Sequence, residues 1–405
     1  MKIFSTGDLH IGQSLKYGKT DSSGRSDKLQ EQQQMLSDFV DKAIEEKADV
    51  VAFNGDYFPK HFRINPDAMR IFAEQVLRLD KAGITVLVLD GNHDKSRVEA
   101  SDSTVALFDV FKLKNVRVIN KPELIWINDV GFAMMPHLIP AELETYKHKD
   151  SDGVVEAMHN AIQSLSDEVV AQRENGKGTE PCIFFGHFGI AEAGRGSETT
   201  MIAGNNIAVP AVLLDLPAFN WCILGHIHKR WDWEGQFSKI SYLGAMDRFD
   251  FAEAGDIKQY GIINVEDNEV TLEFVNTNAR EFIDIKHDFS VEQNYEFLNE
   301  YDFKDTVVKV SVEVDKDFVT GKELVSELRQ RLEDAGVYHI HAVNLVYKPT
   351  YVSQNEAVTE AESIEDNLKQ VLADEKFDDI DELMQLHEVL TKELRAEEDA
   401  EAEKS

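Results

Sequence analysis

Short apolar runs alternate with longer segments of helical periodicity up to residue 282. The runs have the length of buried strands. We predict strands at Lys2–Thr6, Val50–Asn54, Thr85–Leu89, Val116–Ile119, Val130–Met134, Cys182–Phe185, Trp221–Leu224 and Ile240–Leu243. This alternation predicts an α/β sandwich in which helices cover the faces of the sheets.

Two segments between these strands have the pattern of amphipathic helices. In the first, the apolar residues that recur at the helical period are Leu29, Leu36, Phe39, Val40, Ala43 and Ile44. The second begins at Asn65-Pro66, where Asn suits the cap and Pro the first turn, and Gly83 lies just past its end. Its buried face is predicted to contain Met69, Phe72, Ala73, Val76 and Leu77.

A hairpin is predicted to close this first domain. Tyr260–Val265 and Val270–Phe274 read as its two strands, joined across Glu266-Asp-Asn-Glu269. We therefore expect the first domain to cover residues 1–282.

Residues 283–405 have a different pattern of apolar and polar positions. Val308, Val310, Val312 and Val314 alternate as in a half-buried strand, Leu324, Val325, Leu328 and Leu332 share a helical face, and Ile340–Val346 is strand-like. Residues 283–350 thus predict a small α+β domain. In 351–405 we expect a polar linker up to residue 362, helical segments around Ile364–Leu372 and Phe377–Leu390, and a charged tail, Ala396–Ser405.

The charge of the chain changes the expected partners. The 405 residues carry a formal net charge of -33, and a nucleic-acid binder usually has a basic balance. The charge is uneven, however, because residues 351–405 contain 18 acidic and five basic side chains. Bound divalent cations would offset more of it locally. The acidity argues against a DNA substrate without excluding one.

Cysteine usage and hydropathy favour a cytoplasmic protein. Cys182 and Cys222 each lie in an apolar run, which predicts core thiols rather than a disulfide. The first residues lack the apolar segment of a signal peptide, and no apolar run approaches the roughly 20 residues that span a membrane. We expect a soluble cytoplasmic protein with no membrane contact.

Five short motifs each follow a predicted strand. They are Gly7-Asp8-Leu9-His10, Asn54-Gly55-Asp56, Asp90-Gly91-Asn92-His93-Asp94, Gly186-His187 and Gly225-His226-Ile227-His228. The carboxyl ends of strands are where an α/β sheet presents its site. One such motif alone is more often an ordinary turn, but five in this order indicate a metal centre.

The side chains in these motifs suit two divalent ions. Carboxylate, imidazole and amide groups form a mixed nitrogen and oxygen set without thiolate, which fits Mn, Fe or Zn better than a structural zinc site. Two ions about 3.5–4 Å apart stabilise the attacking and leaving oxygens of a displacement at phosphorus. A carboxylate is the natural bridge between them.

The motif order resembles the calcineurin-like metallophosphoesterase superfamily, which implies a β-sandwich flanked by helices. Ser241-Tyr-Leu-Gly-Ala-Met-Asp-Arg248, Phe249-Asp-Phe-Ala-Glu253 and Tyr260-Gly-Ile-Ile narrow the resemblance to the SbcD-type (meiotic recombination eleven) nucleases. The layout of phosphoesterase domain, small capping domain and C-terminal helices is also similar.

This resemblance implies a role for each motif residue. Asp8, His10 and His228 would hold the first metal, and Asn92, His187 and His226 the second. Asp56 would bridge the two ions, for which manganese is expected. His93 would not be a ligand but would lie near the scissile phosphate, where it stabilises the transition state or protonates the leaving oxygen.

One position departs from the family pattern. The family usually has His or Asp three residues after the bridging Asp, but Pro59 stands there in this chain. Either Lys60 or His61 takes over that function, or both are surface residues.

Other polar residues near the motifs have two readings. His137 is expected to be a loop histidine rather than a ligand. Lys229, Arg230 and Arg248 either contact a phosphate backbone or are solvated surface charges. The segment Gly194–Glu198 reads equally as a flexible substrate loop or an ordinary surface loop.

The leading hypothesis is a Mn-dependent DNA exonuclease and endonuclease for DNA repair or recombination. The resemblance implies a homodimer, and an SbcC-type coiled-coil ATPase bound through the C-terminal helices. The alternative is a standalone phosphatase or small-nucleotide phosphodiesterase with the same metal chemistry. The capping domain and C-terminal helices favour the nuclease, since a small-molecule enzyme needs neither.

Overall fold

The computed structural model describes most of the chain up to residue 348. The described residues are 1–12, 20, 22, 26–60, 64–95, 103–147, 153–178, 181–193, 208–315, 318–348, 368–369, 372, 379–381 and 383–387. The chain divides into two compact units. One comprises Met1–Val312 with Thr320–Leu345, and the other comprises Glu313–Val319 with Val346–Ser405.

The first large sheet has six strands in the order β14-β13-β1-β2-β3-β4. Its four parallel strands are β1 (Lys2–Thr6), β2 (Val50–Phe53), β3 (Thr85–Leu89) and β4 (Val116–Ile119). The predicted hairpin forms β13 (Gln259–Glu266) and β14 (Glu269–Asn276), and β13 pairs antiparallel with β1. Asp267 and Asn268 form its turn with positive φ angles of 50° and 65°, as two-residue hairpin turns require.

The second large sheet has the order β11-β12-β10-β7-β6-β5. Its strands are β5 (Glu123–Ile127), β6 (Val130–Met135), β7 (Cys182–His187), β10 (Trp221–Gly225), β11 (Trp231–Glu234) and β12 (Lys239–Tyr242). The strands β6, β7, β10 and β12 run parallel, so their carboxyl ends meet at one edge. A separate short pair consists of β8 (Gly189–Ile190) and β9 (Ala208–Val209).

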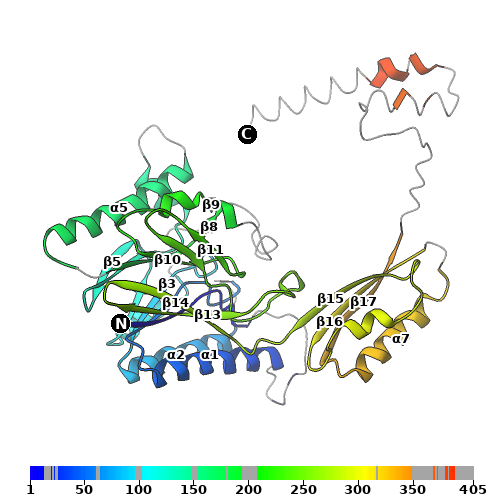
Figure 1. Cartoon of the computed structure of the whole chain (residues 1–405), viewed down its shortest axis with the longest axis horizontal. Helices are drawn as coiled ribbons and strands as arrows, with labels where there is room; N and C mark the ends of the chain where they lie inside the picture. Colours follow the sequence, from blue (N-terminus) through cyan, green and yellow to red (C-terminus); the bar gives the residue numbers. More distant parts are fainter. Residues whose placement is uncertain are drawn as a thin grey trace. The chain divides into compact units, whose positions relative to one another are not determined.

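The two sheets pack face to face, and helices cover their outer faces. Ile3, Val50 and Leu87 of the first sheet share one buried cluster with Phe132 and Ile223 of the second. The helices α1 (Asp27–Glu45) and α2 (Pro66–Ala82) cover the first sheet, and α5 (Val154–Glu174) covers the second (Figure 1). Short helices are α3 (Leu107–Phe111) and α4 (Pro140–Leu143). This sandwich flanked by helices confirms the predicted fold class.

Local chemistry determines both ends of α2, as the sequence predicts. The Asn65 side chain accepts a hydrogen bond from the backbone N–H of Asp67, and Pro66 occupies the first turn. Gly83 ends the helix in the left-handed conformation, with φ of 78°, which glycine adopts without steric cost.

A three-stranded sheet follows the sandwich in the chain. It has the order β15-β16-β17, formed by Phe282–Asp288, Val307–Val314 and His339–Tyr347. The helix α7 (Gly321–Asp334) buries Leu324, Leu328 and Leu332, and the alternating valines of β16 are buried. The predicted strands at 308–314 and 340–346 and the predicted helix are confirmed. The domain limits 1–282, 283–350 and 351–405 stay predictions.

Much of the predicted C-terminal region lies outside the described residues. Of those that are described, Leu368, Leu372, Ile380 and Leu383 are helical. The predicted linker, 351–362, and the charged tail, Ala396–Ser405, lie outside the described residues.

Two further sequence predictions concern the described chain. Cys182 and Cys222 are free and buried, which confirms that they are core thiols. In the part of the chain that the structure describes, every helix is too short or too polar to cross a membrane.

Candidate metal centre

The sandwich brings the five motifs together at the carboxyl ends of its strands. In the first sheet, Asp8 follows β1, Asp56 follows β2 and Asn92 follows β3, and these strands are parallel neighbours. In the second sheet, His187 ends β7 directly opposite Gly225, so His226 emerges beside it. Residues up to 220 positions apart in the chain thus share one site.

One cluster consists of Asp8, His10 and His228. All three are buried, and one candidate ligand atom from each lies within 4.8 Å of the others. The Nε2 atoms of His10 and His228 are 3.2 Å apart. The Asp8 carboxylate accepts the backbone N–H of His226 at 2.9 and 3.0 Å, which ties the first motif to the last.

The other cluster consists of Asp56, His187 and His226, also buried and with ligand atoms within 4.8 Å of one another. Asn92 belongs with it, because its Oδ1 atom lies 3.0 Å from His187 Nε2 and 2.9 Å from His226 Nδ1. The structure therefore groups the candidate ligands into the same two sets that the resemblance implies.

Asp56 lies between the two sets. Its Oδ2 atom is 3.3 Å from His187 Nε2 in the second cluster and 3.8 Å from His10 Nε2 in the first. This carboxylate has the position that a bridge between two ions requires.

The protonation states of the imidazoles fit divalent cations. The Nδ1–H of His187 donates to the Asn54 carbonyl at 2.6 Å, so Nε2 faces the oxygens of Asp56 and Asn92. Burial alone would lower the pKa of His187, but the charge and hydrogen bond of Asp56, the charge of Asp8 and the hydrogen bond to Asn54 together raise the pKa to about 9. At this raised pKa a proton on His187 Nε2 lies between the imidazole nitrogen and the oxygens of Asp56 and Asn92. A metal ion bound at the same point would replace that proton and be held by the same atoms.

Two other histidines of the site are held neutral. Burial is the main cause of the lowered pKa values of His10 and His226, and the charge of a neighbouring histidine adds to it. A neutral imidazole has the free lone pair that metal ligation needs. Burial also raises the pKa of Asp8 to about 6, a cost that a nearby cation removes.

The backbone of the site is strained. Asp8, His10, Asp56 and His226 have φ angles of 52°, 39°, 57° and 101°, in a region that residues with a Cβ rarely occupy. Such conformations persist only where the surrounding structure imposes them, and they concentrate at functional sites.

Asp94 is a residue of this site to which sequence reasoning gave no role. Its carboxylate accepts the backbone N–H groups of Asp56, Tyr57 and Gly91 at 2.7, 3.1 and 2.9 Å. One buried side chain thus connects the loop of the bridging carboxylate to the loop of Asn92. The Asn-His-Asp motif contained the signal, but sequence alone does not show that the carboxylate faces inward.

His93 lies beside Asp56 and outside both ligand sets. Its backbone N–H donates to Asp56 Oδ1 at 2.8 Å, and its Nε2 lies 3.9 Å from Asp56 Oδ2. The side chain is 16% exposed, whereas the candidate ligand His187 is fully buried. An imidazole at the solvent side of the centre is placed to meet a substrate.

At Pro59, where the chain departs from the family pattern, the main chain contacts His93. The Nδ1–H of His93 donates to the Pro59 carbonyl oxygen at 2.7 Å. Lys60 is exposed, as the surface reading expects, and His61 lies outside the described residues. The main-chain oxygen of Pro59 therefore orients the His93 ring.

A second group of residues backs the first cluster from the segment after β12. The Nδ1–H of His228 donates to Glu253 Oε1 at 2.9 Å. The Phe249 ring packs edge-on against His10, with centroids 5.1 Å apart, and against His228, at 5.3 Å. In the sequence analysis this segment supported the family resemblance, but no role was predicted for Phe249 or Glu253.

His137 follows β6 and approaches the second cluster. Its backbone N–H donates to the Asp90 carbonyl at 2.9 Å. Burial, and then the charge of His187, lowers the pKa of His137 to about 3. It is a loop residue outside both ligand sets, as predicted, but its loop borders the site.

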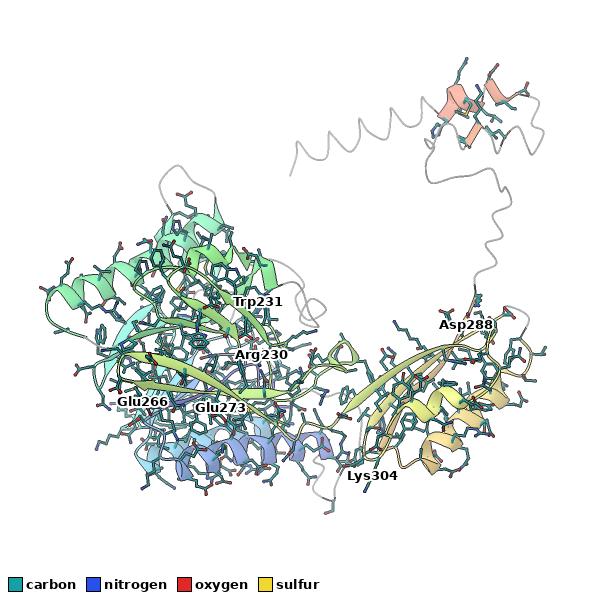
Figure 2. All side chains as sticks on the ribbon, in the orientation of Figure 1. Arg230, Trp231, Glu266, Glu273, Asp288 and Lys304 are labelled. Carbon is teal, nitrogen blue, oxygen red and sulfur yellow. The ribbon has the colours of Figure 1, made fainter. Side chains whose placement is uncertain are left out.

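The basic residues near the motifs have different environments. Arg248 is buried, and its guanidinium donates to the carbonyls of Ala279, Arg280 and Asp256, so the expectation of a surface or phosphate-contacting role is wrong. Arg230, labelled in Figure 2, stacks 3.7 Å over the Phe274 ring and pairs with Asp232.

Lys229, like Arg230, is an exposed cation next to the His226–His228 motif. Its side chain is 70% exposed, and Nζ lies 3.4 Å from Asp256. The segment Gly194–Glu198 lies outside the described residues.

Two buried ligand clusters at the strand ends of a helix-flanked sandwich define a metal-dependent phosphoesterase. The calcineurin-like phosphoesterase family profile matches residues 1–230, and the chain belongs to that family. Membership assigns the protein to the metal-dependent hydrolases of phosphoester bonds, and the two clusters are its candidate metal sites.

Solved structures with a similar fold include other phosphoesterases. A dimetal phosphatase from Danio rerio is 13% identical, matching 68% of this chain and 96% of its own, with a TM-score of 0.42. The phosphopantetheinyl hydrolase of Mycobacterium tuberculosis is 11% identical, matching 60% and 89%, with a TM-score of 0.32.

Proposed function

We propose that the protein is a two-metal DNA nuclease that cuts phosphodiester bonds in DNA repair or recombination. The observation that carries the proposal is His93, a partly exposed imidazole held beside the bridging carboxylate Asp56 by the Pro59 carbonyl. A phosphodiester has an alkoxide leaving group that needs a proton, and a positioned imidazole supplies one.

In this proposal Asp8, His10 and His228 hold one divalent ion, and Asn92, His187 and His226 hold the other, with Asp56 between them. When bound, two manganese ions neutralise charge on the phosphoryl oxygens and activate a water. The Nδ1–H of His93 is donated to the Pro59 carbonyl, so Nε2 is the atom that meets the substrate. In the imidazolium form Nε2 carries a second proton, and this is the proton that His93 would give to the leaving oxygen.

The parts outside the sandwich support DNA over a small phosphoester. The small sheet β15-β16-β17 is tied to α1, because Arg280 pairs with Glu31 at 2.6 Å as well as with Asp305. Near the C-terminus, the described residues 383–387 are helical. We propose that this segment binds an SbcC-type coiled-coil ATPase and that the protein acts as a homodimer in the cytoplasm.

The test compares three substrates with the full-length protein and Mn²⁺. Linear double-stranded DNA, single-stranded DNA and bis-p-nitrophenyl phosphate report on nuclease and small-phosphodiesterase activity. The proposal expects cleavage of DNA with a kcat/KM well above that for the small ester. Hydrolysis of the small ester, with no cleavage of DNA, would instead favour a standalone phosphatase or small-nucleotide phosphodiesterase.

A control variant excludes a contaminating nuclease. Asp56→Asn protein, purified in parallel, should show no activity above background on any of the three substrates. Glu46→Gln is the matched carboxylate control, because Glu46 pairs with Lys2 and Lys42 at the far end of the sandwich from the site.

A further inference from the structure

The two clusters differ in what stands behind their histidines. In the second cluster, His187 donates its Nδ1–H to a neutral backbone carbonyl, that of Asn54. In the first, His228 donates its Nδ1–H to the carboxylate of Glu253 at 2.9 Å. A carboxylate behind a ligand histidine fixes its tautomer and makes the opposite nitrogen a better donor to a metal.

Glu253 is built into the interior rather than placed by chance. Its side chain is 1% exposed, and its two oxygens have separate partners. Oε1 faces His228, while Oε2 accepts Lys258 Nζ at 2.7 Å and the backbone N–H of Phe249 at 3.2 Å. Donors on both of its oxygens therefore fix this buried carboxylate in one orientation behind His228.

Lys258 contacts both Glu253 and His228. Its ammonium is 1% exposed and also donates to the His228 carbonyl at 3.2 Å. Lysine and glutamate therefore hold the main chain and the side chain of one candidate ligand together.

The turn that carries Glu253 is fixed from its other side. In the 3₁₀ turn Phe251–Glu253, the Phe251 ring lies 5.1 Å from the Phe282 ring and 5.0 Å from the His341 ring of the small sheet. A carboxylate on a turn that is packed at both ends keeps its position when the site is empty or filled.

We propose that Glu253 is the positioning residue of the first metal site. It directs His228 Nε2 toward the ion and, with Lys258 supplying the balancing charge, raises the affinity of that site alone. The inference rests on the proposed metal ligation by His228. It assigns to Glu253 and Lys258 a function that a merely structural ion pair would not have.

The experiment measures Mn²⁺ binding to the full-length protein after removal of metal with a chelator. Bound Mn²⁺ is counted by electron paramagnetic resonance, in which a dinuclear centre has its own signal. Wild type is expected to bind two ions. Glu253→Gln should weaken one of the two sites by about 10–100-fold, the usual effect of losing a carboxylate behind a ligand. The other site should keep its affinity, and added Mn²⁺ should restore the dinuclear signal.

Two further variants separate positioning from stability. Glu253→Gln leaves the Lys258 charge buried without its partner, which is destabilising, so the double variant Glu253→Gln/Lys258→Met is measured beside it. Both should show the same shift in Mn²⁺ dependence, whereas Glu46→Gln should match wild type.

The outcomes are distinguishable. Unchanged Mn²⁺ affinity in a folded Glu253 variant, or an equal loss at both sites, overturns the role of Glu253. A wild-type protein that binds no pair of Mn²⁺ ions overturns the metal centre of the proposed function instead.

Discussion

The Nδ1 atom of His93 lies 2.7 Å from the carbonyl oxygen of Pro59. A carbonyl only accepts hydrogen bonds, so this contact requires the proton on Nδ1 and leaves Nε2 directed toward the metal centre. The proline side chain takes no part in it. The contact therefore depends on a main-chain group that any residue at position 59 would supply.

The first prediction follows from this contact. Pro59→Ala keeps the carbonyl, so kcat should stay within about threefold of wild type, far from the loss that general acid–base catalysis represents. The free energy of unfolding should fall by about 0.4–1 kcal/mol, because alanine gives the unfolded chain more freedom. Steady-state kinetics and urea unfolding check both. A loss of about 100-fold in kcat would mean that the proline ring itself shapes the site.

His93→Ala should separate chemistry from metal binding. The side chain lies outside both ligand sets, so the variant should retain two metals by elemental analysis. Its rate should fall by at least about 100-fold, the scale of a lost general acid. If the variant loses metal instead, His93 is a ligand and the proposed role is wrong.

Asp56→Asn should lose metal and nearly all activity while staying folded. The side chain lies between the two clusters, so its charge serves both ions. Its backbone N–H donates to Asp94 and its carbonyl accepts from His10, and neither contact needs the carboxylate. Elemental analysis and circular dichroism test the two halves of this expectation. A fully active variant contradicts the two-metal assignment.

The buried thiols should make the protein less stable at high pH. Burial raises the pKa of Cys182 from 9.0 to about 12. Below pH 9 both states hold the proton. Above it the unfolded state releases the proton while the folded state keeps it, so stability falls between about pH 9 and 12, at no more than about 1.4 kcal/mol per pH unit.

Urea unfolding at a series of pH values measures this decline. Cys182→Ala should have a shallower decline above pH 9 than wild type, and the same slope below it. Identical slopes in the two proteins would show that other buried groups, such as Tyr57, cause the effect.

Truncation after residue 350 should separate cleavage from partner binding. Phe377–Leu390 has apolar residues at helical spacing, and a helical segment of this size has too little core to be stable alone. We expect metal content and Mn-dependent cleavage of short DNA to persist. Co-purification with the ATPase, and stimulation by ATP, should be lost.

The acidic surroundings of this segment add a second readout. With 18 acidic side chains in residues 351–405, binding to a basic partner surface should weaken as salt rises. Unchanged affinity of the truncated protein for the ATPase contradicts the docking role.

The central strands and α2 could be predicted because local residues determine them. Buried parallel strands have continuous apolar runs, as in Thr85–Leu89, and Asn65, Pro66 and Gly83 mark both ends of α2. The edge strands Glu123–Ile127 and Trp231–Glu234 were missed. Both are only partly buried. Trp231–Glu234 alternates tryptophan with acidic residues and so lacks such a run, whereas Glu123–Ile127 contains a run of only four apolar residues.

The candidate ligands were also readable, because glycine and ligand residues stand together after each strand. The residues that hold them were not. Glu253 reaches His228 across 25 positions, Asp94 acts on main-chain groups, and Pro59 uses an atom that no side-chain motif records. Such contacts exist only once the loops have met in space.

The left-handed backbone at Asp8, His10, Asp56 and His226 opposes the stability of the fold. Each such residue costs of order 1–3 kcal/mol relative to a relaxed backbone. A descendant that abandoned hydrolysis could place glycine at these positions and gain thermal resistance. Selection for stability and selection for turnover therefore favour different residues at these four positions, which lie in three separate loops.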